Sequence, residues 1–245
     1  MNDLITIWIA GGTPFPTAAA VTIVFAVLAY LVRGVSVSGA IAGSLLCFIL
    51  YTNAGWGAFA ALVTVFLLAW ITTKIGYGRK KELGIAEERG GRSASQMFAN
   101  LSVAALFALI YAAIDHRGAF LLAAGAALAE AAGDTVSSEF GQSQSHSARL
   151  LTTWEPVPAG TDGGLTLAGT IAGIFAAVAV GAVYASSGEI SWGSLWILVL
   201  AATLGFMTDS ILGATLERRR VLNNDSVNFL STLVAALAAL VIASI

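Results

Sequence analysis

Acidic residues inside long apolar stretches are the feature of this sequence best suited to chemistry. Glu130 and Asp134 are four residues apart, so on a helix they share one face, which Ser138 extends. Asp209 lies in a second apolar stretch. A carboxylate within a membrane span costs roughly 2.5–3.5 kcal/mol on insertion scales, so acids at such depths are usually paired or functional. We therefore predict that Asp134 and Asp209 are catalytic.

A third acid, Glu139, follows Asp134 on the same stretch. Mg²⁺ prefers oxygen ligands, and nucleotide phosphates can complete its coordination shell. The sequence predicts that Asp134, Glu139 and Asp209 bind such a metal ion. The alternative is that these acids lie at helix ends, solvated at the membrane interface or paired with nearby arginines.

Segments rich in glycine, amides and basic residues are candidates for binding phosphate. The segment Pro158-Ala-Gly-Thr-Asp-Gly-Gly164 immediately precedes a predicted helix, so its backbone amides could face an anion at the helix N-terminus. In an ordinary loop, Thr161 or Asp162 would instead cap that helix. Most basic residues could equally serve membrane orientation and lipid headgroups. The residues predicted to contact nucleotide or phosphate are Arg79, Lys80, Arg92, Asn100, Ser138, Thr161, Asp162, Gly163, Gly164, Asn224 and Asn228.

Several kinds of site are excluded or disfavoured by what the sequence lacks. No Gly-x-x-x-x-Gly-Lys-Ser/Thr motif occurs, which excludes a P-loop ATPase. Cys47 is the single cysteine, so an internal disulfide or a multi-cysteine metal site is excluded. We do not expect His116 or His146 beside the acids. A phosphate monoester is anionic near neutral pH and needs no base, so this residue set suits phosphate-to-phosphate transfer.

The elements that must position these residues are membrane helices. The 245 residues are 58% hydrophobic and 11% charged, with a mean hydropathy of +0.85, whereas soluble domains are about 25% charged. We predict one integral membrane domain, residues 1–245, that forms an all-α bundle of about eight spans, with seven as the alternative. The predicted spans are 17–32, 37–51, 55–71, 95–114, 118–138, 165–185, 192–213 and 227–245.

The basic residues are distributed unevenly between the two sides of this predicted bundle. Of the 12 lysines and arginines, all except Arg117 fall on one side. The positive-inside rule makes that side cytoplasmic and places both termini outside the cytoplasm. Every candidate site residue then lies at the cytoplasmic end of a helix or in a cytoplasmic loop, which predicts one shared site on that face.

A repeat also divides the predicted bundle. Residues 34–43 match residues 164–173 at an offset of 130, which suggests two parallel four-helix halves of about 1–115 and 116–245. Chance similarity is the alternative, because small residues four apart recur wherever membrane helices pack closely. On either account, Gly39, Gly43, Gly169 and Gly173 are predicted to form helix-packing faces.

Four motifs together resemble a known membrane family over nearly the whole chain. They begin at Gly133 (GDTVSSEFG), Pro158 (PAGTDGG), Asp209 (DSILGATLE) and Asn223 (NNDSVN). The resemblance is to the integral membrane family that contains transmembrane protein 19 and plant phytyl-phosphate kinase. The first motif is also similar to that of the CTP-using phytol and dolichol kinases.

This resemblance implies CTP as the phosphoryl donor. It also implies that Asp134 and Glu139 lie at the nucleotide and metal site, with Asp209 and Asn224 beside it. Residues 161–164 would then lie at a phosphate. The chain has Asp162 where the family usually shows asparagine, which adds a negative charge there.

The combined prediction is a membrane kinase that uses CTP and Mg²⁺ to convert an isoprenoid monophosphate, of the prenyl or phytyl type, into its diphosphate. One alternative is a CTP-dependent lipid cytidylyltransferase. A transporter is another, although transport sites lie near the bilayer midplane, and a scaffold whose basic loops bind a partner is a third. The expected partners are the lipid substrate, the nucleotide and membrane lipids, without nucleic acid, and an oligomer remains open.

Overall fold

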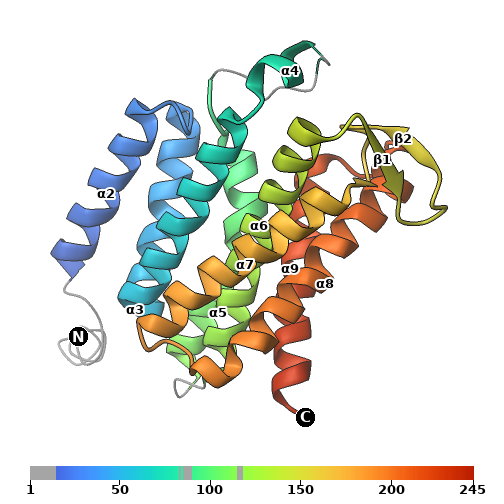
Figure 1. Ribbon diagram of the computed structural model, residues 1–245. Helices are drawn as coiled ribbons and strands as arrows, with labels where there is room; N and C mark the ends of the chain where they lie inside the picture. Colours follow the sequence, from blue (N-terminus) through green and yellow to red (C-terminus); the bar gives the residue numbers. More distant parts are fainter. Residues whose placement is uncertain (1–14, 83, 85–89, 115–117) are drawn as a thin grey trace.

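A computed structural model describes residues 15–82, 84, 90–114 and 118–245 of the chain as a bundle of helices (Figure 1). The helices are α2 (Phe15–Leu31), α3 (Val37–Lys74), α4 (Tyr77–Glu82), α5 (Ala94–Ala113), α6 (Gly118–Gln144), α7 (Leu167–Ser186), α8 (Leu195–Leu212) and α9 (Asn224–Ala243). Among the described residues, six helical segments are long and apolar enough to cross a membrane, and α2 is a shorter apolar helix. The predicted polytopic helical bundle is confirmed, with fewer long helices than eight.

The difference in helix number comes from α3, which is a helical hairpin. Gly55 interrupts its 38 residues with a φ of 79° and a ψ of −173°, a conformation that glycine adopts readily because it has no Cβ. Trp70 near the end of α3 donates from Nε1 to the Val32 carbonyl just before its start, at 3.2 Å. The two limbs therefore run side by side (Figure 1), and they correspond to the predicted spans 37–51 and 55–71.

Helix α6 forms the centre of the bundle and packs against α3, α5, α7, α8 and α9. Its middle is built from small residues, of which Ala123, Ala124, Ala126 and Ala127 have no exposed surface. Gly125 leaves room for the Tyr184 ring, which would lie 2.8 Å from an added Cβ. Small side chains let membrane helices approach closely, and this is why one helix can be surrounded by five others.

Gly39, Gly169 and Gly173 of the repeated motif lie at close backbone contacts, as predicted, whereas Gly43 has only an ordinary contact with Met97. A Cβ on Gly39 would lie 2.0 Å from the Arg92 carbonyl oxygen. A Cβ on Gly169 would lie 2.4 Å from the Ser137 carbonyl oxygen, so these contacts admit no side chain. The division into halves of about 1–115 and 116–245 stays a prediction.

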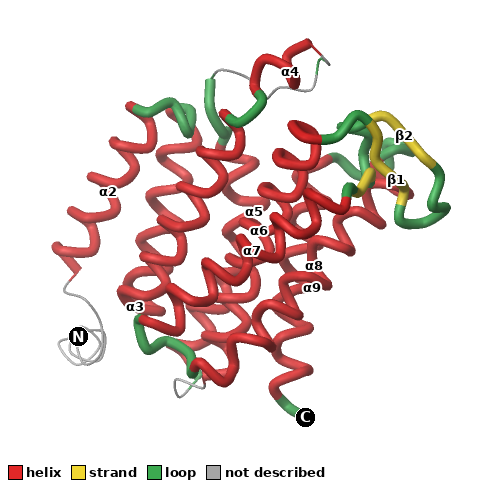
Figure 2. Tube along the Cα trace, in the orientation of Figure 1, coloured by secondary structure: helices red, strands yellow, loops and turns green. Residues whose placement is uncertain are grey.

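The segment between α6 and α7 contains a small sheet that the all-α prediction lacked. Strand β1 (Ser147–Leu150) pairs antiparallel with both β2 (Pro156–Pro158) and β3 (Gly164–Leu165), in the order β2-β1-β3. Figure 2 shows these strands in yellow at one end of the helices. The available sequence signal was the alternation of polar and apolar residues in Ser147-Ala-Arg-Leu150, which matches the two-residue period of a strand with one buried face.

The sheet also changes the place of the glycine-rich segment. Residues 158–164 form the connection between β2 and β3, and α7 begins only at Leu167. Its N-cap is Thr166, whose hydroxyl accepts a hydrogen bond from the Gly169 amide at 3.0 Å. The alternative in which Thr161 or Asp162 caps this helix is therefore wrong, because strand β3 separates these residues from it.

Candidate active site

A polar cavity of about 330 Å³ lies at the end of the bundle that carries the sheet. Segments far apart in the sequence line it: the N-terminal parts of α5 and α9, the C-terminal parts of α6 and α8, and the connection between β2 and β3. Most of the predicted site residues are brought together there. They are Arg92, Asn100, Asp134, Ser138, Glu139, Thr161, Asp162, Gly163, Gly164, Asp209, Asn224 and Asn228.

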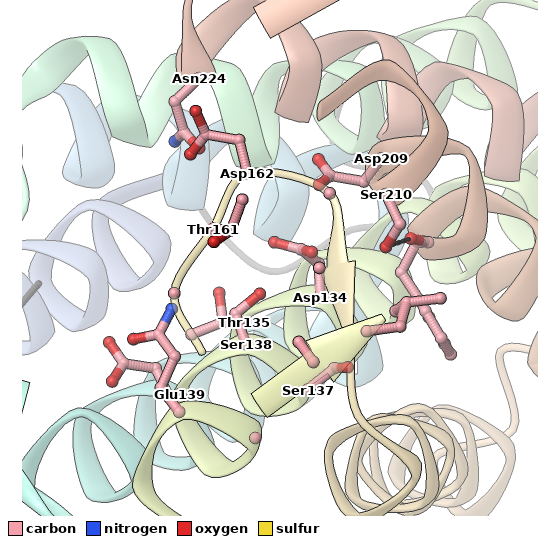
Figure 3. A pocket seen from close by; sticks show the side chains of 18 of the residues that line it. Asp134, Thr135, Ser137, Ser138, Glu139, Thr161, Asp162, Asp209, Ser210 and Asn224 are labelled. Carbon is pink, nitrogen blue, oxygen red and sulfur yellow. Dashed lines mark hydrogen bonds between the residues drawn. The ribbon is translucent and has the colours of Figure 1, made fainter. Parts of the chain in front are cut away.

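The two predicted catalytic acids face this cavity from different helices. Figure 3 shows Asp134 of α6 and Asp209 of α8 directed toward the same space, with Thr161 and Asp162 nearby. The Oδ2 atom of Asp209 is buried and has no hydrogen-bond partner within the part of the chain that the structure describes. A buried carboxylate without a partner is costly, so this arrangement favours a bound cation.

Glu217 is an acid that sequence reasoning missed. It ends the π-helical segment η2 (Gly213–Glu217), which continues α8, and it lines the same cavity. Its charge lies close enough to interact with those of Asp134 and Asp162. The available sequence signal was its position at the end of the motif that begins with Asp209. In the structure this motif contains a π-helical turn, and such turns often occur at functional sites.

The β2–β3 connection is fixed against this π-helical segment. Gly163 has a φ of 74°, and a Cβ there would lie 2.2 Å from the Ala214 backbone nitrogen, so glycine is required on both counts. The amides of Thr161 and Gly164 donate to carbonyls within the connection itself, at 3.2 and 2.8 Å. These two amides are therefore used inside the turn, contrary to the expectation that the segment directs its amides to an anion at a helix start.

Glu139, which is partly exposed at the cavity, forms an ion pair with the buried Lys80. Lys80 of α4 is 1% exposed and also donates to the carbonyls of Thr73 and Thr72, at 2.8 and 3.2 Å. The Thr73 hydroxyl donates to the other oxygen of Glu139 at 3.1 Å. Lys80 is thus placed as the partner of Glu139 and outside the cavity lining, which differs from its predicted contact with phosphate.

The predicted three-acid metal site is not assembled. The described residues contain no group of three or more His, Cys, Asp or Glu side chains positioned to hold a metal ion, and both oxygens of Glu139 already have partners. Mg²⁺ is usually bound by one or two carboxylates together with substrate phosphates. Asp134 and Asp209 fit that smaller role, because Asp209 keeps an unpartnered oxygen at the cavity.

Other residues of the cavity lining favour anions. Asn224 begins α9 and Asn228 lies one turn further along it, where the helix N-terminus carries a partial positive charge, and Asn100 lies in the second turn of α5. Arg92 is the one basic side chain among the described residues that line the cavity. The cavity lining therefore combines acids suited to a cation with amides and one arginine suited to phosphate.

The remaining predicted residues lie away from this arrangement or outside the described part. The side chain of Arg79 and the whole of His116 lie outside the described residues. His146 is exposed next to the sheet, where its carbonyl accepts from the Ala159 amide at 3.3 Å, and it does not line the cavity. The acids in the cavity thus have no histidine beside them within the described residues.

Fold and cavity together define a polytopic helical membrane protein with a polar site at one end of its bundle. The chain belongs to the family described as integral membrane protein DUF92, whose model matches residues 20–236.

Similar proteins occur in bacteria, archaea and plants. A membrane protein of Synechocystis sp. is 33% identical over 196 residues, which cover 78% of this chain and 76% of the relative. A membrane protein of Methanocaldococcus jannaschii is 32% identical over 207 residues, or 83% of this chain and 84% of the relative. The chloroplastic protein VTE6 of Arabidopsis thaliana is 30% identical over 218 residues, or 86% of this chain and 66% of the relative. No solved structure matches the chain significantly.

Proposed function

We propose that this protein transfers the terminal phosphoryl group of CTP to an isoprenoid monophosphate, giving the diphosphate and CDP. The observation that carries this proposal is that one cavity is lined both by the acids Asp134 and Asp209 and by Arg92, Asn224 and Asn228. Phosphoryl transfer depends on positioning and on electrostatic stabilisation, and such a cavity supplies both. The motif resemblance to phytyl-phosphate kinase supports the choice of substrates.

The acids and the anion-binding residues have distinct tasks in this reaction. Asp134 and Asp209 would hold Mg²⁺, which would neutralise charge on the transferring phosphoryl group. The side-chain amides of Asn224 and Asn228 hold the nucleotide phosphates, and Arg92 holds the acceptor phosphate. An oxygen of the acceptor monophosphate forms the new bond to the terminal phosphorus, and the bond from that phosphorus to the bridging oxygen breaks. CDP leaves with the electron pair, and no side chain has to remove a proton.

The proposed orientation places this cavity at the cytoplasmic face, where nucleotides are available. Arg92, Arg149 and Arg218 lie in the segments at the end of the bundle that carries the cavity. By the positive-inside rule that end faces the cytoplasm and both termini lie on the other side. Reporter tags at the two termini are expected to read extracytoplasmic, and a cytoplasmic C-terminus would overturn this orientation.

A product assay with purified protein tests the activity. The protein is incubated with Mg²⁺, CTP labelled at either the α or the γ position, and a series of isoprenoid monophosphates. Phosphoryl transfer moves the γ label into a lipid diphosphate and releases CDP. Release of pyrophosphate with the α label in a lipid product would instead identify a cytidylyltransferase. The Asp209→Asn variant serves as the matched control, because it keeps the side-chain shape and removes the charge.

A further inference from the structure

A second cavity adjoins the polar one and is apolar. It lies between α2, the two limbs of α3 and α5, and Figure 1 shows α2 beside α3 at the edge of the bundle. We define this apolar groove by six of its lining residues: Phe25, Ala29, Gly43, Leu62, Phe66 and Met97. We propose that the apolar groove binds the hydrocarbon chain of the lipid phosphate acceptor; this inference rests on the proposed function.

The apolar groove is continuous with the candidate active site. Arg92, Asn100 and Thr135 line both cavities, so the boundary between polar and apolar walls runs along these three residues. A molecule that spans the boundary must have an anionic or polar head and an apolar tail. A lipid phosphate has this chemistry, with its phosphate beside the Arg92 guanidinium and its chain directed into the groove.

Gly43 marks the path of the chain along α3. Gly39, one turn nearer the site, abuts the Arg92 carbonyl, and four helical residues span about 6 Å. A Cβ on Gly43 would meet only Met97, whose Sδ would lie at an ordinary 3.6 Å, so alanine fits there without strain. A larger side chain at position 43 would project into the groove about one helical turn beyond the phosphate.

The groove is narrow, at about 60 Å³, so a long chain needs a neighbouring helix to move aside. Helix α2 suits this role. It packs on α3, and Ile23, Val24 and Val27 on its outer face are exposed, as expected for a helix that faces lipid. The ring contact between Phe25 and Phe66, with centroids 5.4 Å apart, closes the groove between α2 and α3.

A substitution at Gly43 separates chain binding from chemistry. We expect Gly43→Leu to raise the KM for a twenty-carbon isoprenoid monophosphate at least tenfold. The kcat/KM for a five-carbon monophosphate should change less than threefold, because that chain ends before position 43. Gly43→Ala is the matched control and should behave as the wild type with both acceptors. Equal losses with both acceptors, or no loss with the long one, would overturn the proposal.

Photo-labelling provides a readout that needs no turnover. A twenty-carbon lipid phosphate with a diazirine in its chain, added to the full-length protein in detergent, should label peptides of α2 and the first limb of α3. The labelling should fall at least fivefold in Gly43→Leu. Labelling confined to the outer faces of α7 and α8 would overturn the groove even if the enzyme makes diphosphate. Labelling in the groove without any product would instead reject only the proposed phosphoryl transfer.

Discussion

Glu139 and Asp209 are both acids at the same end of the bundle, yet they differ in whether their carboxylate oxygens have partners within the protein. Both oxygens of Glu139 are bound, one by Lys80 and the other by the Thr73 hydroxyl. Asp209 keeps a buried oxygen without a protein partner in the described residues, and it faces a polar cavity. A carboxylate whose two oxygens are satisfied internally supports the fold, whereas one that keeps an unpartnered oxygen at a polar cavity is available to a ligand.

The largest expected effect is the loss of activity when either Asp134 or Asp209, the two proposed metal ligands in the cavity, is neutralised. Asp209→Asn and Asp134→Asn should each lower turnover by about a hundredfold or more, because each removes electrostatic stabilisation of the transferring phosphoryl group. The double variant should be hardly slower than either single variant, since residues that act on one metal are strongly non-additive. Initial rates with a prenyl monophosphate measure this.

The stability of the same variants provides the control. Both should purify normally and unfold at or above the wild-type temperature, because a buried negative charge has been removed. Near-normal turnover in Asp134→Asn would mean that the acid serves helix packing.

For the ion pair between Lys80 and Glu139 we expect a loss of stability and only a small loss of turnover. Lys80→Met leaves the partly buried Glu139 carboxylate without its cation and should lower stability by about 1–3 kcal/mol. The double variant Lys80→Met, Glu139→Gln should recover most of that loss. Thermal unfolding in detergent measures both, with turnover per folded protein expected to fall less than tenfold. If Lys80→Met instead raised the KM for nucleotide without loss of stability, Lys80 would contact phosphate as the sequence predicted.

Glu217 lines the cavity beside other acids and is not the partner of Lys80. We therefore expect an effect intermediate between that of Asp209 and that of Glu139. We expect Glu217→Gln to raise the Mg²⁺ concentration needed for half-maximal activity about tenfold, as changes near a metal commonly do. Turnover at saturating Mg²⁺ should stay close to that of the wild type. A fall in turnover that excess Mg²⁺ does not restore would assign Glu217 a direct role with the substrates.

Glu189 lies at the far end of the bundle, and its carboxylate is expected to have a structural role only. It accepts a hydrogen bond from the Gly57 amide at 3.1 Å, and burial raises its pKa despite that bond. A carboxyl whose pKa is raised by folding stabilises the protein most below its unfolded pKa, and this contribution is lost as the pH rises through the folded value. Glu189→Gln should remove that pH dependence in thermal unfolding and leave turnover unchanged. A variant that kept the same dependence would assign it to another group.

The smallest effect is expected at His146. Because it is exposed and does not line the cavity, His146→Ala should leave turnover within about tenfold, or ~1.4 kcal/mol, of the wild type. Rates with a monophosphate acceptor across pH 6 to 8 measure this. A collapse of activity would indicate that the reaction needs a base and that the acceptor is an alcohol.

The amino-acid sequence by itself determined the helical membrane architecture. Lipid offers no hydrogen bonds to the backbone, so a long apolar stretch must fold as a helix, and the predicted span 95–114 corresponds closely to α5 (Ala94–Ala113). The sequence also indicated Asp134 and Asp209, since an acid in such a stretch is costly unless it is used. These inferences need only the local composition of the sequence, without knowledge of which residues are in contact.

Only the tertiary structure decided which acids have protein partners. The pairing of Glu139 with Lys80 depends on α4 contacting α6 across 59 residues of chain. The contact of Gly163 with Ala214, which sets Glu217 at the cavity, likewise joins distant segments. The apolar groove requires α2, α3 and α5 to leave a gap between them. Such features arise from the packing of several helices at once, and hydropathy along the chain does not record which faces meet.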